Sequence, residues 1–320
     1  MELALQVIKD ELDAFEKHFK TAVQSRVPLL DRIMQYIVKR KGKQLRPMFV
    51  LLSAKLGAPV NDGTYRAASL VELLHTATLV HDDVVDEAME RRGFFSINAL
   101  WKNKVAVLVG DYLLSKGLLL SLSNNDFTVL QIMSEAVKQM SEGELLQMEK
   151  SRNLKIDEAI YFDIIKGKTA SLLASACAAG AATTFSKPEQ VEQMRLFGEK
   201  VGMAFQIKDD LFDYGTNHIG KPTGNDIKEK KLTLPLIYTL NKCSAKERRY
   251  LMYILKNENK NKIKVQQVIK QVERSGGIQY TITIMNQYRD EALSVLHSFP
   301  ESEVRSALEE LVRFTTDRQY

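Results

Sequence analysis

The chain has 320 residues, of which 45% are hydrophobic and 27% are charged, a composition typical of a globular protein. Its net charge is +5, with acids and bases interspersed along the sequence. That pattern argues against a nucleic-acid-binding protein, which would show a clustered basic face, and it suits a small anionic substrate.

We expect neither a division into domains nor a targeting segment. No linker rich in Pro, Gly or Ser interrupts it, so we expect one domain over residues 1–320. Acidic residues break the N-terminal segment, which therefore does not resemble a signal peptide. No stretch reaches the length and apolarity that we would expect of a membrane span. We therefore expect a cytoplasmic protein with no transmembrane segment.

Helical periodicity begins at the N-terminus and recurs along the chain. Apolar residues are spaced three and four apart at Leu5, Ile8, Leu12, Phe15 and Phe19. The run "SLLASACAAGAATTF" from Ser171 predicts a tightly packed core helix with a buried thiol at Cys177.

Helix boundaries are predicted by prolines and by one capping box. Pro47, Pro188 and Pro300 are placed where helices would begin. Ser244 and Glu247 have the spacing of a capping box. No alternating strand pattern is evident, so the sequence predicts an all-α fold of about ten or more helices.

Two polar stretches interrupt the helical pattern. Residues 214–231, "YGTNHIGKPTGNDIKEKK", contain glycines without periodicity and predict a mobile loop. Residues 256–264, "KNENKNKIK", predict a solvated surface loop rather than a binding segment.

An acidic cluster follows the apolar run "SLVELLHTATLV". In "HDDVVDEAMERR", Asp82, Asp83 and Asp86 form a D-D-x-x-D motif. Like charges four residues apart on a helix destabilise it by roughly 0.2–0.5 kcal/mol per pair. The repulsion needs a reason, and a bound cation would supply one.

A second D-D-x-x-D motif is formed by Asp209, Asp210 and Asp213 in "FQIKDDLFDY". The first and last aspartates of such a motif project from one helix face. Two such helices facing each other could hold divalent cations between them. Magnesium suits carboxylates that leave room for water and phosphate oxygens. The alternative for a single motif is an acidic, solvated helix face, but two motifs after apolar runs favour metal binding.

Basic residues near these motifs indicate sites for phosphate groups. Arg91 and Arg92 follow the first motif and could bind diphosphate oxygens, although a surface ion pair with Glu87 or Glu90 is the alternative. Lys43 and Arg46 precede the helix predicted at Pro47, whose N-terminus already favours anions.

Further candidate ligands lie elsewhere. Lys168 and Thr169, in "KGKTAS", do not form a P-loop, because Phe162 occupies the position of its first glycine. They remain possible diphosphate ligands. Lys221 could move over a bound diphosphate from the polar loop. His75 could donate a hydrogen bond to phosphate, or be an ordinary core histidine.

Together, "GKQLRP", "HDDVVDEAMERRG", "GKTA" and "FQIKDDLFDYxxxxxxxGKPTGND" resemble the motifs of the all-trans polyprenyl diphosphate synthases. The similarity extends from Gly42 to about Pro235. It is greatest to bacterial medium- and long-chain synthases such as octaprenyl or heptaprenyl diphosphate synthase. The resemblance implies a helical bundle around a central cavity, Mg²⁺ as cofactor, and a homodimer.

The resemblance also assigns roles to individual residues. It implies that isopentenyl diphosphate condenses with an allylic diphosphate such as farnesyl diphosphate, giving a product of the octaprenyl class for quinone side chains. The implied magnesium ligands are Asp82, Asp83, Asp86, Asp209, Asp210 and Asp213. The implied ligands of the allylic diphosphate are Arg91, Lys168, Thr169, Gln206 and Lys221, and those of isopentenyl diphosphate are Lys43, Arg46, His75 and Arg92.

Product length is expected to depend on side chains just before the first motif. In this family, bulky residues four or five positions before the first aspartate stop short products, and here these positions hold Ala77 and Thr78. Because both are small, we expect a product longer than geranylgeranyl diphosphate.

Two alternatives are weaker. A class I terpene cyclase shares the helical fold, but its second metal motif would need Ser or Thr at Asp213 and Glu at Asn217. The chain could also be the catalytic subunit of a heteromeric synthase, since it keeps both aspartate motifs.

Overall fold

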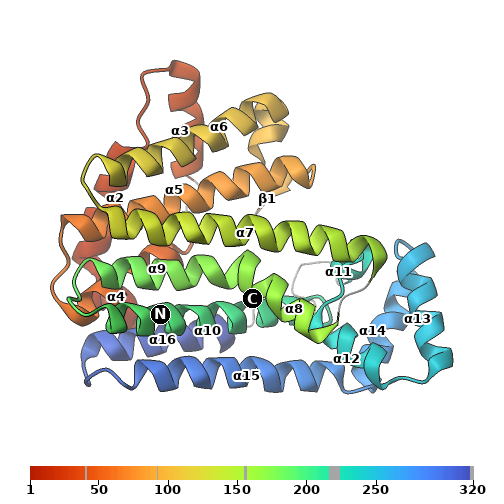
Figure 1. Ribbon diagram of the computed structural model, residues 1–320. Coiled ribbons are helices and arrows are strands. Elements are labelled where there is room, and N and C mark those ends of the chain that lie inside the picture. The colour runs from red at the N-terminus through yellow and green to blue at the C-terminus, as the bar shows by residue number, and fades with distance from the viewer. Residues whose placement is uncertain (40–41, 92, 155–156, 216–223, 318–320) are drawn as a thin grey trace. The chain divides into compact units, whose positions relative to one another are not determined.

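The computed structural model describes residues 1–39, 42–91, 93–154, 157–215 and 224–317, and almost all regular structure in these ranges is helical (Figure 1). The α-helices are α1 (Glu2–Val7), α2 (Lys9–Ala22), α3 (Pro28–Val38), α4 (Leu45–Gly57), α5 (Asp62–Val85), α6 (Ile97–Leu122), α7 (Phe127–Asn153), α8 (Glu158–Ile165), α9 (Ser171–Ala182), α10 (Pro188–Phe212), α11 (Asn225–Lys228), α12 (Leu234–Lys242), α13 (Ala245–Asn257), α14 (Lys262–Arg274), α15 (Gly277–Leu296) and α16 (Glu303–Asp317). A π-helical turn, η1 (Lys166–Ala170), links α8 to α9. Strands β1 (Glu90–Arg91) and β2 (Phe94–Phe95) pair in an antiparallel hairpin. The predicted all-α fold of ten or more helices is confirmed.

Contacts within the chain divide it into two compact units. The first unit comprises Met1–Val137, Ser175–Arg195 and Phe299–Glu310, and the second comprises Lys138–Ala174, Leu196–Ser298 and Leu311–Tyr320. The first aspartate motif belongs to the first unit and the second motif to the second unit. The expectation of one domain over residues 1–320 stays a prediction.

In the first unit, the long helix α5 lies against α4 and α6. Asn61 caps α5, because its side chain accepts a hydrogen bond from the Thr64 amide at 3.1 Å. Gly117 on α6 permits a close approach, since a Cβ there would lie 2.7 Å from a methyl carbon of Leu70 on α5. The apolar face of α5 is thus buried along its length, and its last turn carries the first motif.

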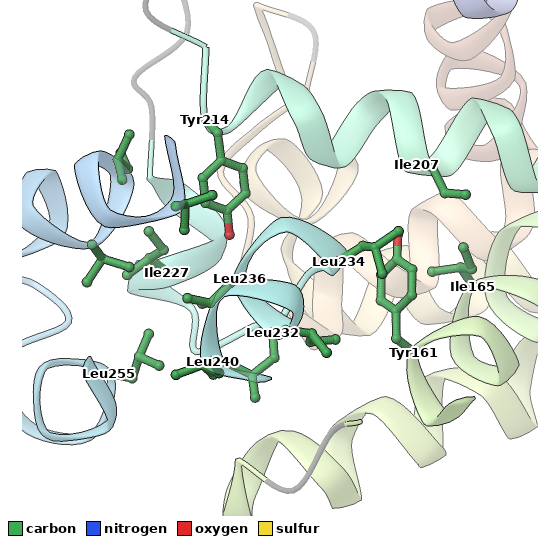
Figure 2. Packing of buried hydrophobic residues seen from close by; sticks show 14 of the residues in the cluster. Tyr161, Ile165, Ile207, Tyr214, Ile227, Leu232, Leu234, Leu236, Leu240 and Leu255 are labelled. Carbon is green, nitrogen blue, oxygen red and sulfur yellow. The ribbon is translucent and has the colours of Figure 1, made fainter. Parts of the chain in front are cut away.

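The core of the second unit gathers residues of α8, α10, α12 and α14 (Figure 2). Figure 2 shows Tyr161 beside Ile165 and Leu234, and Tyr214 near Ile227. Each tyrosine hydroxyl in this core needs a polar partner. That of Tyr214 pairs with the Thr233 hydroxyl at 2.8 Å.

Several helix ends differ from the predicted positions. Pro188 begins α10 as predicted, but α4 begins at Leu45, two residues before Pro47. Helix α16 begins at Glu303 rather than at Pro300, because the Ser302 hydroxyl accepts the Arg305 amide at 3.1 Å and caps the helix.

Other local predictions are confirmed. The capping box of Ser244 and Glu247 is present. The small-residue run forms α9, and burial raises the pKa of the Cys177 thiol to about 12. The periodic N-terminal segment is helical, although a non-helical backbone conformation at Ile8 separates α1 from α2.

Helix α6 corrects one expectation. By length and composition alone α6 is apolar enough to cross a membrane, although we expected from the sequence that no stretch would be. About a third of its most apolar window is buried, and the helix packs along α5. The core helix of a water-soluble protein can meet the same criterion. The finding therefore concerns the length and composition of α6 and does not place the helix in a membrane.

Candidate functional site

The first aspartate motif occupies the C-terminal turn of α5. The Asp86 amide donates to the Asp82 carbonyl at 2.8 Å, so the helical turn continues through the motif. Asp82 is half-buried and Asp86 is exposed, whereas Asp83 is only 4% exposed. The helical period therefore separates the three carboxylates, and the middle one points into the protein.

Asp83 is paired with one of the predicted diphosphate ligands. Its carboxylate accepts a hydrogen bond from Nε of Arg91 at 2.7 Å. Burial raises the pKa of Asp83, and the Arg91 guanidinium opposes that shift. From the sequence, Glu87 and Glu90 were the alternative ion-pair partners of Arg91. In the structure Arg91 pairs with Asp83 of the motif. Asp83 fixes the position of Arg91 at the start of the β1–β2 hairpin.

Apart from Arg92, the other predicted residues of the first unit lie just before α4, on α4 or on α5. Lys43 is exposed just before α4, and Arg46 is half-buried in its first turn. His75 and Ala77 are buried on α5, and the Thr78 hydroxyl donates to the His75 carbonyl at 2.8 Å. Arg92 lies outside the described residues.

The second motif lies at the C-terminal end of α10. As in the first motif, its middle aspartate is buried and its outer two are more exposed. Asp209 is exposed, Asp213 is half-buried, and Asp210 is buried. The Asp210 carboxylate accepts the Tyr161 hydroxyl at 2.7 Å and Nε2 of Gln206 at 2.8 Å. Oε1 of Gln206 in turn accepts the Thr169 hydroxyl at 2.9 Å. The structure thus brings together Thr169, Gln206 and Asp210, three predicted site residues from two segments.

Carboxylates crowd this end of α10. Burial raises the pKa of Asp210 to about 7, and the hydrogen bonds from Tyr161 and Gln206 oppose the shift. Burial, followed by repulsion from Asp210 and Asp213, raises the pKa of Asp226 to about 8. These acids disfavour one another's negative charge, and a cation bound nearby would relieve that cost. Oxygen donors of this kind fit a hard cation such as magnesium.

Asp213 accepts hydrogen bonds from backbone amides of residues 224–226. Its two carboxylate oxygens accept the amides of Asn225 at 2.8 Å and Asp226 at 3.0 Å, and its carbonyl accepts the Gly224 amide at 3.0 Å. The two ends of the segment between residues 213 and 224 therefore meet at Asp213. Lys221, within that segment, lies outside the described residues.

Lys168 and Thr169 lie on the π-helical turn η1, and such turns often occur at functional sites. This turn lies tightly against α7, since a Cβ on Gly143 would be 2.7 Å from the Lys168 amide nitrogen. The Lys168 ammonium forms an ion pair with Glu144 and lies 3.4 Å from Oε1 of Gln147.

Sequence reasoning missed Tyr161, Glu144 and Gln147. They come from α7 and α8, whose patterns are those of ordinary amphipathic helices. The one available signal was the "EG" pair at Glu142 and Gly143. A glycine within a predicted helix often has a packing reason.

No group of three or more His, Cys, Asp or Glu side chains within the described ranges is arranged so that it could hold a metal ion. Asp83 and Asp210 are engaged by Arg91 and by Tyr161 and Gln206, which accounts for this in part. Magnesium commonly takes only one or two carboxylates beside substrate phosphates.

The all-helical fold with two D-D-x-x-D motifs defines a class, the prenyltransferases that make isoprenyl diphosphates. The sequence model of the polyprenyl synthetase family matches residues 27–272, so the chain belongs to that family.

Curated relatives agree with this family. The chain is 35% identical to the all-trans-nonaprenyl-diphosphate synthase (geranyl-diphosphate specific) of Rhodobacter capsulatus, over 98% of this chain and 97% of that protein. It is 30% identical to heptaprenyl diphosphate synthase component 2 of Bacillus subtilis, over 99% of this chain and 91% of that protein.

Solved structures share the fold over nearly the whole chain. A polyprenyl synthase from Caulobacter crescentus, complexed with calcium and isoprenyl diphosphate, matches with a TM-score of 0.91 and 31% identity, over 100% of this chain and 98% of that one. A geranylgeranyl pyrophosphate synthase from Bacteroides thetaiotaomicron matches with a TM-score of 0.84 and 37% identity, over 99% and 98%.

The hydrogen bond from Tyr161 to Asp210 leads to a stability prediction. Tyr161→Phe removes a donor from a buried carboxylate, and hydrogen bonds to charged groups contribute about 1.5–3 kcal/mol. Tyr214→Phe is the matched control, because its hydroxyl pairs with the neutral Thr233. We expect Tyr161→Phe to cost more in urea unfolding of the metal-free protein.

The pH dependence of that difference follows from the raised pKa of Asp210. The folded pKa of about 7 exceeds the ordinary value, so the wild-type protein loses the stability linked to Asp210 as pH rises toward and past 7. The Tyr161 hydroxyl stabilises the ionised form, so its removal should cost more above pH 7 than below it. Equal costs for both variants at all pH values would contradict this assignment.

Proposed function

We propose that the chain condenses isopentenyl diphosphate with an allylic diphosphate, such as farnesyl diphosphate, into a medium- or long-chain all-trans polyprenyl diphosphate. The proposed product is of the octaprenyl class and serves quinone side chains. The observation that carries the proposal is the pair of D-D-x-x-D motifs at the ends of α5 and α10 in a chain of this family. Both substrates are highly charged and water-soluble, so we also propose a cytoplasmic enzyme.

We propose Mg²⁺ as the cofactor, held by aspartates of both motifs. The carboxylate oxygens suit this ion, and the Caulobacter crescentus relative is described with calcium. Among these aspartates, Asp86 and Asp209 are exposed and Asp82 is half-buried, whereas both carboxylate oxygens of Asp213 accept backbone amides. Bound magnesium would stabilise the negative charge that develops on the departing diphosphate. The proposed ligands are Asp82, Asp83, Asp86, Asp209, Asp210 and Asp213.

The cationic and polar side chains would bind and orient the two diphosphates. On the allylic side, ionisation of the C–O bond leaves an allylic cation, which the isopentenyl double bond attacks, and a proton is then lost to the departing diphosphate. No side chain is needed as a covalent nucleophile. The proposed allylic ligands are Arg91, Lys168, Thr169, Gln206 and Lys221, and the proposed isopentenyl ligands are Lys43, Arg46, His75 and Arg92.

The activity is tested by incubating the purified chain with Mg²⁺, farnesyl diphosphate and labelled isopentenyl diphosphate. Chromatography of the dephosphorylated products should show a ladder that ends in one long linear prenol. Asp82→Ala and Asp209→Ala should each lower the rate by orders of magnitude, because each removes a metal ligand, and leave the thermal transition nearly unchanged. A near wild-type rate in either variant would refute the metal assignment.

A matched control is Asp62→Ala, which removes a carboxylate from the first turn of the same helix α5. This variant should keep wild-type turnover. A hydrocarbon product would favour a terpene cyclase instead. The absence of any incorporation by the wild-type chain would favour a catalytic subunit that needs a partner, as the designation "component 2" of the Bacillus subtilis relative suggests.

We propose that the small residues before the first motif allow a long product. Ala77 is fully buried, so a large side chain there would overpack the core and confuse loss of stability with a change of product. Thr78 is half-buried and is the cleaner position to test.

Thr78→Phe should shorten the product by one or more isoprene units, because its ring would block the growing chain. The product distribution is read by chromatography, and Thr78→Val serves as the control of nearly equal volume. An unchanged product length in Thr78→Phe would remove this position from the length-determining set.

We further propose that the chain forms a homodimer through α6. Its outward side carries exposed apolar residues spaced at helical intervals, including Leu108, Leu119 and Leu122. Several exposed apolar residues on one helix commonly mark an interface between proteins. A second copy of the chain would cover it.

Leu108→Glu combined with Leu119→Glu should convert the dimer into a monomer, because two charges would be buried in the interface. Sedimentation velocity of wild type and variant measures the change. A variant that remains dimeric would exclude this face, and a monomeric wild-type chain that is inactive alone would favour a heteromeric partner.

A further inference from the structure

The helical hairpin α13–α14, residues 245–274, carries more net positive charge than the whole chain. It contains nine Lys and Arg against three Glu, a net charge of +6, whereas the chain totals +5. The cations are Lys246, Arg248, Arg249, Lys256, Lys260, Lys262, Lys264, Lys270 and Arg274, and all but Lys264 are exposed. The remainder of the chain is therefore close to neutral.

The positive charge of the hairpin is not compensated locally. Within the described part of the chain, none of these nine side chains forms an ion pair with a carboxylate, whereas Lys166 and Lys200, elsewhere in the same unit, do. Two of the three acids have other partners. Glu247 caps α13 with Ser244, and Glu258 accepts Nδ2 of Asn261 at 3.2 Å.

The charges gather because the two helices bury their apolar sides. Residues such as Leu255 on α13 and Val268 on α14 are fully buried, and α13 packs against α14 (Figure 1). The polar sides of both helices therefore face water together. Between the lysines, Ile263 is 73% exposed in the first turn of α14, and Tyr253 is 52% exposed on α13.

The hairpin is attached to the segment that follows the second aspartate motif. A Cβ on Gly224 would lie 2.4 Å from a methyl carbon of Val265, so the backbone there is in close contact with α14. Nζ of Lys230 donates to the Lys256 carbonyl at 3.0 Å, and the Asn259 side chain donates to the Lys228 carbonyl. The basic surface thus adjoins the motif within one compact unit.

We propose that the α13–α14 hairpin docks the protein on an anionic phospholipid surface. The proposal rests on the proposed function, since a long polyprenyl diphosphate has an apolar tail that partitions into a bilayer. Clustered cations beside an exposed apolar side chain suit the lipid interface, where lysines meet headgroups and Ile263 meets the acyl boundary. A lipid interface engages both the cations and the exposed isoleucine, which makes lipid the better partner.

The test is flotation of the full chain with vesicles of phosphatidylcholine alone or mixed with phosphatidylglycerol. The wild-type protein should bind only the anionic vesicles, and binding should weaken as salt is raised. Each lysine near such a surface contributes about fivefold to affinity, so Lys256→Gln, Lys260→Gln and Lys262→Gln together should weaken binding about a hundredfold. Ile263→Ser should weaken it by about tenfold, which a purely ionic contact would not show.

The matched control removes the same charge from α2. Lys9→Gln, Lys17→Gln and Lys20→Gln change three exposed lysines whose helix also carries acids, and this variant should bind as wild type does. Circular dichroism melts check that every variant folds. Wild-type binding to neutral vesicles, equal loss in both triple variants, or lysine-dependent binding of single-stranded RNA without vesicle binding would each overturn the proposal.

The outcome is separable from that of the proposed function. The hairpin lysines are not among the proposed substrate ligands, so the hairpin variant should keep its turnover with water-soluble substrates in the absence of vesicles. Synthase activity without vesicle binding would refute the docking surface alone. Vesicle binding by a chain that makes no prenyl product would refute the proposed function and leave the docking surface in place.

Discussion

A carboxylate that leaves water must find hydrogen-bond donors, and both aspartate motifs contain one such group. Asp210 receives the Tyr161 hydroxyl and the Gln206 amide, and Asp83 receives the Arg91 guanidinium. These contacts tie α8 and α10 together in one unit, and the β1–β2 hairpin to α5 in the other. Losing any of these donors would leave a buried charge and weaken the local fold and the site at once.

The helical period explains why each motif has two kinds of aspartate. Residues four apart share a face, so Asp82 and Asp86 project together, and the intervening Asp83 turns about 100° away. The apolar run before each motif buries the face on which the middle residue lies. In each motif the middle aspartate is therefore the buried one, and it binds side chains of neighbouring segments.

The charge distribution adds a second constraint on this protein. Along the sequence the lysines of residues 245–274 are diluted by apolar residues at helical spacing, and the average over the chain looks balanced. Folding removes the apolar residues from the surface and leaves the cations on one hairpin next to the second aspartate motif. A synthase whose product grows more apolar with each condensation would gain from meeting anionic lipid at that place.

Local pattern by itself determined the fold class, most helix positions, both aspartate motifs and the family. These depend on periodicity, capping and spacing, which are properties of neighbouring residues. The tertiary structure alone decided that Arg91 pairs with Asp83, that Tyr161 supports Asp210, and that Asp213 joins the ends of a polar loop. It also decided that the small-residue contact of Gly143 positions Lys168. Each of these joins residues whose separation in the sequence carries no pattern, because packing of distant segments, rather than local spacing, brings them into contact.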